Sequence, residues 1–368
     1  MIRSQNRRLH FQNSINSYTN VKNENNPIPS FNNNSNREVK FYQSRSTLNN
    51  ELYELWQCNQ TSEFIQKTKY KLVNNLQELF RDIFPYIGLY IIGSTVNGFG
   101  QCNSELDICL MISHDKLSEY ESSYILQKIR DIFQHGEYFR HVKLVKRTFS
   151  ILILFDLLTS ITCNIYLNEA VTIRNTFLMR FYSECDHRLP ILINTIKYWA
   201  SKINLKQRIH NSFNGYCLTL MCIYYLQIAV SPSPIVPRFN ELLSINKFDK
   251  NIDIRKLNLY NTIDLAKIWI STNVTVEVAD LFIGFLKFYA IDFDFPNYVI
   301  SIRTGRKMNK RELNNEIDRI NRYVVIEEPL IGTNLASDIS TDKIYQELIE
   351  IFRTTYNKVS STHRLTSL

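Results

Sequence analysis

Residues Tyr90 to Ile112, YIIGSTVNGFGQCNSELDICLMI, decide the fold of this chain. An apolar run stops at Gly93 and Ser94, a polar loop with two further glycines follows, and a second apolar run contains Asp107. This pattern predicts a strand, a turn, a loop and a second strand. Glu105 and Asp107 are two residues apart at the start of the second strand, so we expect their carboxylates to point to the same face.

Two acids beside a turn of small residues suit a site for a divalent metal and a nucleoside triphosphate. The backbone amides of Gly93 and Ser94 can donate hydrogen bonds to phosphate oxygens, while Glu105 and Asp107 can ligate the metal. The alternative is a hairpin whose acidic edge faces solvent. A lone E-x-D motif favours that alternative, but the Gly-Ser turn about ten residues upstream favours the site.

The composition is that of a globular protein with a large core. The chain has 368 residues, 44% of them hydrophobic, which suggests two domains or three. The net charge of +8 suits a polyanionic partner, although many basic proteins have none. The seven cysteines are odd in number and form no C-x-x-C motif, which indicates reduced thiols in a cytoplasmic protein without a zinc site.

Neither a signal peptide nor a membrane span is expected. The first residues are basic and polar without an apolar core. The most apolar later run, Tyr216 to Val230, is too short to cross a bilayer comfortably, so a buried helix is the better interpretation.

Composition and periodicity divide the chain into four parts. Residues 1–47 are rich in Asn, Ser and Arg and are predicted to be a disordered leader. Residues 48–180 alternate predicted helices with strand-like runs, which indicates a small α/β domain with a mixed sheet. Its first helix is a candidate to pack on the following domain. Residues 181–358 are predicted to form a helical central domain, and residues 359–368 a tail.

The individual elements follow from the spacing of apolar residues. In the first domain we expect helices at 61–84, ending at Pro85, and at 117–135, and strands at 150–158 and 160–167. In the second domain we expect helices that start at Pro190 and that cover 212–227, 280–290 and 341–358. Residues 238–263 are predicted to be polar and connective.

These segments resemble those of polymerase-β-type nucleotidyltransferases, in which Gly-Ser precedes an acid-x-acid pair. GSTVNGFG followed by SELDICL resembles that catalytic signature. Further segments match, in order, those of template-independent RNA polymerases with a PAP-associated domain: ITCNIYLNEAVTIRNT, IKYWASKINL, GYCLTLMCIYYLQ, LFIGFLKFYAIDFDFPNYVISIR and IEEPLIGTNLA. The NGFG loop and the EEP-x-x-GTN run are most similar to the cytoplasmic poly(A) polymerases of the germline-development-defective type.

This resemblance implies an α+β fold in which a mixed-sheet nucleotidyltransferase domain faces a helical, PAP-associated domain, with ATP in the cleft between them. It implies transfer of AMP from ATP to an RNA 3′-hydroxyl, with Mg²⁺ or Mn²⁺ held by Glu105 and Asp107. Relatives that use UTP carry a histidine in the base-recognition loop, and none lies between Glu327 and Asp338, so ATP is the expected substrate.

The resemblance also assigns roles residue by residue. The metal triad of three aspartates falls on Glu105, Asp107 and Asn164. The positions that match nucleotide-binding residues are Gly93, Ser94, Asn175, Thr176, Lys197, Tyr216, Glu328 and Asn334, with Glu327 in the same recognition segment. Taken singly, Asn175 could be a cap or turn residue, Lys197 a solvated lysine and Tyr216 a core aromatic. Their joint order favours the site.

Two of the three metal positions depart from the family pattern. Glu105 keeps its charge but adds a methylene, which displaces its carboxylate by roughly 1.5 Å. Asn164 is uncharged and cannot accept the proton of the attacking hydroxyl, a loss typically of about 10²–10⁴-fold in rate. The family's serine before Tyr216 is Gly215 here, and its Phe-Asp after EEP is Leu330-Ile331.

Two functions therefore remain open from the sequence. One is an active cytoplasmic poly(A) polymerase. The other is an inactive pseudo-polymerase that binds RNA, ATP or a protein partner. A nucleotidyltransferase that acts on small molecules or proteins is less well supported, because the helical segments resemble the RNA enzymes.

The expected macromolecular partners are an RNA 3′ end and an RNA-binding protein. No RNA-recognition module is evident in the chain, so we expect the partner protein to supply target choice. The basic loop from Arg303 to Arg311 is either a guide for RNA phosphates or a solubilising surface loop.

Overall fold

The computed structural model describes residues 47–84, 86–113, 117–136, 138–146, 150–209, 213–243, 253–254, 269, 275–314 and 323–365. The predicted leader therefore lies outside the described residues, apart from Thr47. The chain divides into two compact units. The first contains Gln60–Arg180 together with residues 253–254, and the second contains the other described residues.

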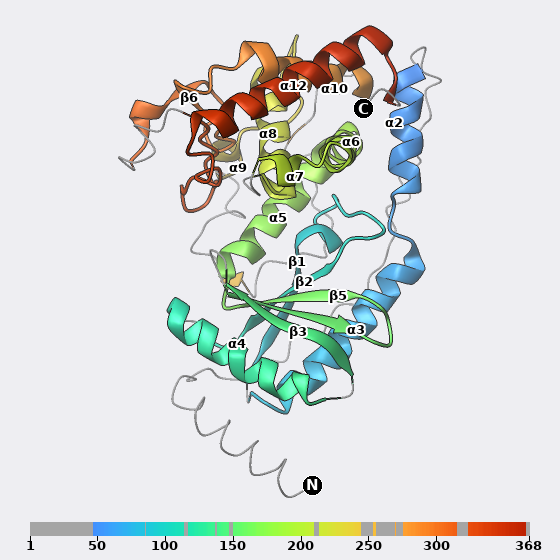
Figure 1. Ribbon diagram of the computed structural model, residues 1–368, viewed down its shortest axis with the longest axis vertical. Helices are drawn as coiled ribbons and strands as arrows, with labels where there is room; N and C mark the ends of the chain where they lie inside the picture. Colours follow the sequence, from blue (N-terminus) through green and yellow to red (C-terminus); the bar gives the residue numbers. More distant parts are fainter. Residues whose placement is uncertain are drawn as a thin grey trace, which may run out of the picture. The chain divides into compact units, whose positions relative to one another are not determined.

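The first unit is built on a five-stranded mixed sheet in the order β1-β2-β5-β4-β3 (Figure 1). The strands are β1 (Gly88–Ile92), β2 (Leu106–Met111), β3 (Phe139–Lys146), β4 (Ser150–Asp156) and β5 (Thr162–Leu167). The predicted hairpin is confirmed, because β1 and β2 pair antiparallel. The sequence did not reveal β3, an edge strand whose alternation is broken by a register shift between Arg140 and Lys143.

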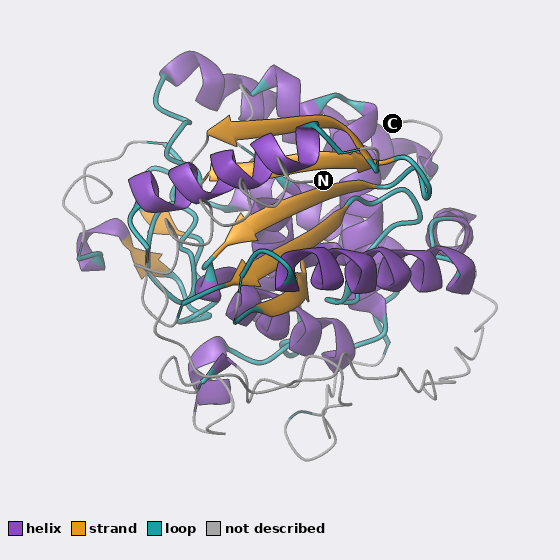
Figure 2. Cartoon of the chain, turned by 90° about the horizontal axis from the view of Figure 1, so that it is seen from below, coloured by secondary structure: helices purple, strands orange, loops and turns teal. Residues whose placement is uncertain are grey.

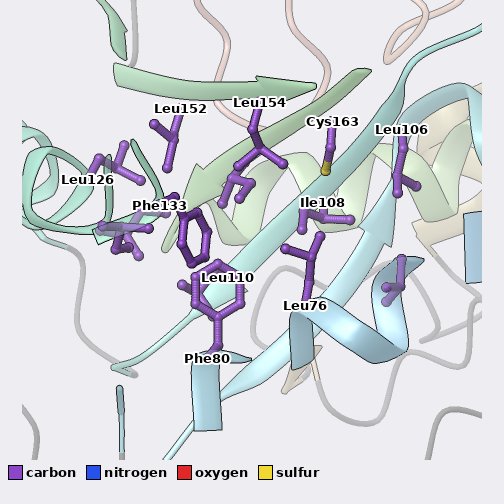
Figure 3. Packing of buried hydrophobic residues seen from close by; sticks show 14 of the residues in the cluster. Leu76, Phe80, Leu106, Ile108, Leu110, Leu126, Phe133, Leu152, Leu154 and Cys163 are labelled. Atoms are coloured by element: carbon purple, nitrogen blue, oxygen red, sulfur yellow. The ribbon is translucent and has the colours of Figure 1, made fainter. Parts of the chain in front are cut away.

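Two helices cover one face of this sheet. They are α3 (Glu63–Arg81) and α4 (Glu119–Gln134), and each begins after a serine whose side chain caps the first turn. Leu76 and Phe80 from α3 meet Phe133 from α4 in one buried cluster with the strand residues (Figure 3). Figure 2 shows helices lying across one side of the strands. Both helices agree with the predicted amphipathic pattern.

Because successive side chains of a strand point to opposite faces of the sheet, the core residues and the candidate site residues lie on different faces. In β2 the core face carries Leu106, Ile108 and Leu110, so Asp107 points to the opposite face. In β5 the core residues alternate in the same way around Asn164. Because β2 and β5 run parallel in a register that pairs Asp107 with Asn164, these two polar side chains lie next to each other away from the helices.

The second unit is mainly helical, as predicted. Its helices are α2 (Thr47–Cys58), α6 (Arg188–Lys202), α7 (Leu205–Arg208), α8 (Gly215–Ile228), α9 (Phe239–Leu243), α10 (Val278–Lys287) and α12 (Asp342–Thr362), and the boundary between the units lies within α5 (Ala170–Cys185). A π-helical turn (Phe288–Asp292) extends α10, and a short β6 (Tyr298–Val299) pairs with β7 (Met308–Asn309). In the described part of the chain, no helix is long and apolar enough to cross a membrane.

Aromatic side chains fill the core of the helical unit. The rings of Trp199, Phe285, Tyr289 and Phe352 contact one another where α6, α10 and α12 meet. Several boundaries differ from the sequence prediction; for example, α12 continues to Thr362, four residues into the predicted tail. Helix α6 begins at Arg188, because a proline within the first helical turn forfeits no intrahelical hydrogen bond, and the segment predicted as connective contains α9.

A side-chain hydrogen bond joins helix α2 to helix α10 within the helical unit. Asn49 on α2 is buried, and its Oδ1 accepts a hydrogen bond of 3.2 Å from the backbone N–H of Ala279 in the first turn of α10. The first N–H groups of a helix have no partner within it, so this contact satisfies one of them from a distant segment.

Replacing Asn49 by alanine is expected to lower the free energy of unfolding by about 1 kcal/mol, the usual value of a lost helix cap. Asn50→Ala is the matched control, because Asn50 is the exposed next residue of the same helix. Urea unfolding followed by circular dichroism measures both. Equal midpoints for the two variants would contradict the capping role.

Candidate nucleotide site

The predicted metal positions come together in the first unit. Nδ2 of Asn164 donates hydrogen bonds to Oε2 of Glu105 at 2.7 Å and to Oδ1 of Asp107 at 2.8 Å. Asn164 is 8% exposed, and its Oδ1 is buried without a hydrogen-bond partner among the described residues. The amide therefore turns its donor toward the two acids and leaves its acceptor unsatisfied.

As it stands, this arrangement does not present three oxygen ligands to a divalent metal. A metal bound by all three side chains needs an oxygen from each of them, but the group of Asn164 that faces the carboxylates is an N–H donor. Among the described residues, no group of three or more His, Cys, Asp or Glu side chains could hold a metal ion. Each of the two acids predicted to bind metal accepts one hydrogen bond from this amide, and metal binding by them stays a prediction.

The acid pair lies in a partly desolvated setting. Burial raises the pKa of Asp107 to about 6, and the charge of Glu105 acts in the same direction. The hydrogen bond from Asn164 and the charge of Lys69 oppose this shift. Asp107 thus depends on its neighbours to remain ionised at neutral pH.

The Gly-Ser turn lies directly against the acid pair. Gly93 begins a short 3₁₀ turn (Gly93–Thr95) with φ of +66°, and a Cβ at this position would lie 2.9 Å from Oδ2 of Asp107. Only glycine satisfies both constraints without strain. The N–H of Gly93 donates to Oγ1 of Thr176 at 3.0 Å, so the structure uses this amide to join the turn to α5.

The two α5 positions predicted to lie near the ribose differ in their surroundings. Thr176 is buried and donates from Oγ1 to the carbonyl of Thr172 at 2.8 Å, in addition to accepting from Gly93. Asn175 has a buried Oδ1 with no hydrogen-bond partner among the described residues. A buried acceptor of this kind needs an explanation, and a bound ligand is one.

Lys69 is a functional candidate that the sequence analysis did not identify. Its side chain is 1% exposed, and Nζ donates to the carbonyl and hydroxyl of Ser104 at 2.8 and 3.0 Å. Nζ also reaches Oγ1 of Thr95 and the carbonyl of Glu105, both at 3.4 Å. One ammonium group therefore ties the Gly-Ser turn to the residue that carries the first acid.

A signal for Lys69 was present in the sequence. Lys69 occupies the apolar stripe of α3, four residues after Ile65 and three before Leu72. Lysine is seldom fully buried unless its ammonium is paired, so its place in this stripe indicates an internal partner.

The predicted nucleotide position Lys197 lies beside Gly215, the first residue of the helix that carries Tyr216. Tyr216 is the second residue of α8, which Asn214 caps by accepting from the N–H groups of Tyr216 and Cys217. A Cβ at Gly215 would lie 3.5 Å from Cε of Lys197, an ordinary contact, so the family's serine would fit here. Burial lowers the pKa of Lys197 to about 8.

Glu328 belongs to the same group of residues. Its carboxylate is buried and accepts from the N–H groups of Leu330 and Ile331 at 2.9 and 2.6 Å. Burial raises the pKa of the Tyr216 phenol well above 10, and the charge of Glu328 adds to this. Glu328 thus both shapes the recognition loop and faces the tyrosine predicted to stack on the base.

The remaining recognition residues are engaged by the protein itself. Asn334 accepts from the N–H groups of Ile326 and Ala336 at 3.1 and 2.9 Å. Glu327 is buried and bonds to the hydroxyl of Ser301 and the guanidinium of Arg303. These contacts hold the loop in one conformation, and a role of Asn334 in nucleotide binding stays a prediction.

Most basic side chains of the loop from Arg303 to Arg311 also contact other groups of the protein. Besides the Arg303 pair, Arg306 pairs with Glu312, and Nζ of Lys307 lies 4.3 Å from the ring centre of Tyr298. Lys310 is buried and donates to the carbonyl of Tyr323 at 2.8 Å. These partners support a structural role for the loop, and guidance of RNA phosphates stays a prediction.

Comparisons with known protein families and solved structures agree with the mixed-sheet and helical units described above. Residues 48–184 match the central palm domain of mitochondrial-like poly(A) RNA polymerase, and residues 277–334 match the PAP-associated domain of the Cid1 family of poly(A) polymerases. The solved GLD-2/RNP-8 complex contains a chain with a TM-score of 0.76 and 28% identity, over 87% of this chain and 96% of that one. This chain belongs to the Cid1/GLD2 family of poly(A) polymerases.

Individual relatives of the Cid1/GLD2 family show how far the likeness extends. Poly(A) RNA polymerase gld-2 of Caenorhabditis elegans is 28% identical over 362 residues, which is 84% of this chain but 32% of the relative. Poly(A) RNA polymerase GLD2 of Bos taurus is 26% identical over 339 residues, 90% of this chain and 68% of the relative. A cytoplasmic RNA terminal U-transferase structure has a TM-score of 0.69 and 26% identity, over 86% of this chain and 93% of that one.

The buried ammonium of this family member can be tested directly. Lys69→Met is expected to lower the free energy of unfolding of the first unit by about 3 kcal/mol, since it leaves buried oxygens without a donor. Lys67→Met is the control, because Lys67 lies on the same helix in an exposed ion pair with Glu63 and should leave the unfolding midpoint unchanged. Small and equal effects in thermal unfolding would refute the role of Lys69.

Proposed function

We propose that this chain is a nucleotide-binding member of the Cid1/GLD2 family in which transfer of AMP from ATP to an RNA 3′-hydroxyl is strongly slowed at Asn164. The pair of hydrogen bonds from Asn164 to Glu105 and Asp107 carries this proposal. An amide neither supplies the third negative charge nor accepts the proton of the attacking hydroxyl. The expected loss is about 10²–10⁴-fold in rate.

Several observations support retained nucleotide binding. The turn at Gly93 keeps a conformation that only glycine adopts without strain next to the acid pair. Lys197 lies beside the N-terminal turn of α8, where Tyr216 faces Glu328. The buried Oδ1 of Asn175 needs a partner that the described residues do not supply.

The remaining parts of the proposal follow from the family. ATP is the proposed nucleotide because no histidine lies between Glu327 and Asp338. An RNA 3′ end is the proposed acceptor, and a protein partner is proposed to choose the RNA, since the related GLD-2 was solved in a complex with RNP-8. The proposed location is the cytoplasm, where a structural relative is named as acting.

Transfer is tested by extension of a short oligo(A) RNA with labelled ATP, in Mg²⁺ and in Mn²⁺. The wild type is expected to be at least about 100-fold slower than Asn164→Asp, because the substitution restores the missing carboxylate. Glu105→Asp/Asn164→Asp tests whether the added methylene matters as well, and Asp107→Ala sets the background. Equal rates for the wild type and Asn164→Asp, both lost in Asp107→Ala, would establish an active polymerase instead.

Nucleotide binding is tested by the ATP-dependent rise in melting temperature. Lys197→Met is expected to abolish this rise, whereas Lys202→Met, an exposed position near the end of the same helix, should retain it. A rise of equal size in both variants would exclude Lys197 from the site.

The pH dependence of ATP binding follows from the lowered pKa of Lys197. The folded value of about 8 lies below the ordinary 10.5, so the ATP-free protein gains stability as the pH rises between these values. ATP favours the charged ammonium, so its stabilising effect should weaken as the pH passes 8. Lys197→Met should remove this part of the pH dependence.

A further inference from the structure

We propose that the amide of Asn164 takes the place of a divalent cation between Glu105 and Asp107, so that the first unit folds and stays folded without metal. The inference rests on the proposed function, which places Glu105 and Asp107 together in the candidate site. It goes further, because it concerns what holds the site together when no nucleotide is bound.

The amide meets the electrostatic need that a cation would otherwise meet. Two carboxylates that converge on one point repel each other unless positive or donor groups lie between them. The NH₂ group of Asn164 gives both acids a hydrogen bond at 2.7–2.8 Å, within the range of charge-assisted bonds. The β2–β5 register fixes this contact, since Asp107 and Asn164 are partners on adjacent strands.

A positive group, the ammonium of Lys69, completes the balance from the core side of the sheet. The buried ammonium of Lys69 donates to the carbonyl of Glu105, and its charge acts on Asp107. Lys69 and the two acids together carry one net negative charge. A site of three aspartates with the same lysine would carry two, and would gain more from a divalent cation.

The two departures from the family pattern act together. Glu105 is not the register partner of Asn164, and it lies before the first residue of β2. The methylene that glutamate adds lengthens its reach across the strands, and its Oε2 lies 2.7 Å from Nδ2 of Asn164. To ligate a cation, the amide would have to rotate by half a turn and give up both hydrogen bonds.

The test is thermal unfolding without nucleotide, in EDTA and in Mn²⁺. The wild type is expected to melt at the same temperature in both. Asn164→Asp should melt lower in EDTA, because three carboxylates then crowd together, and Mn²⁺ should raise its melting temperature by about 4 °C or more.

Asn168→Asp is the matched control for this test. Asn168 is also 8% exposed and follows the same strand, but its amide bonds to the backbone of Ile112 and Ser113. Asn168→Asp should have a lower melting temperature than the wild type in EDTA, and Mn²⁺ should not raise it. If Asn164→Asp fails to fold, Mn²⁺ binding by the wild type is measured instead, through the electron paramagnetic resonance signal of free Mn²⁺. The wild type should leave that signal undiminished.

Stabilisation of the wild type by Mn²⁺ equal to that of Asn164→Asp, or capture of Mn²⁺ by the wild type, would overturn the inference. Its failure is distinguishable from that of the proposed function. A wild type that binds Mn²⁺ but extends RNA slowly refutes only the inference. A wild type that ignores Mn²⁺ without nucleotide but extends RNA rapidly refutes only the proposed function.

Discussion

The parallel pairing of β2 with β5 is the constraint on which the candidate site depends. Backbone hydrogen bonds hold the register, and the two-residue period of each strand then sends Asp107 and Asn164 to the same face. The apolar side chains that alternate with them are buried under α3 and α4. A slip of one residue would bury the acid and expose the core, so packing and site geometry enforce the same register.

Charge in the first unit is balanced across the thickness of the sheet. Lys69 approaches from the helical face, and the Asn164 amide lies among the acids on the other face. Neither group can be removed without leaving a buried oxygen or carboxylate unsatisfied, which is more costly than the net value of the bonds themselves. The Gly-Ser turn belongs to the same assembly, because Thr95 also accepts from Lys69 and Gly93 packs on Asp107.

The helical unit uses its polar residues in a comparable way. Glu328 and Asn334 accept from backbone groups of their own segment, and Glu327 binds the distant Ser301, which holds the recognition loop in place. Arg303 and Arg306 of the basic loop are also paired with carboxylates of the protein. Loop residues that resemble ligand contacts can thus serve first to shape the surface on which a ligand would bind.

The amino-acid sequence by itself determined helices α3, α4, α6, α8, α10 and α12, most strands, the acid pair on one face and the family, because periodicity and motif order are local properties. It did not reveal β3, whose pattern a register shift interrupts, or the internal partners of the basic loop. Only the tertiary structure joined Lys69 to Ser104, 35 residues away, and Asn164 to Glu105, 59 residues away. Such contacts depend on how strands pair and helices pack, and no local pattern encodes which distant donor will satisfy a buried acid.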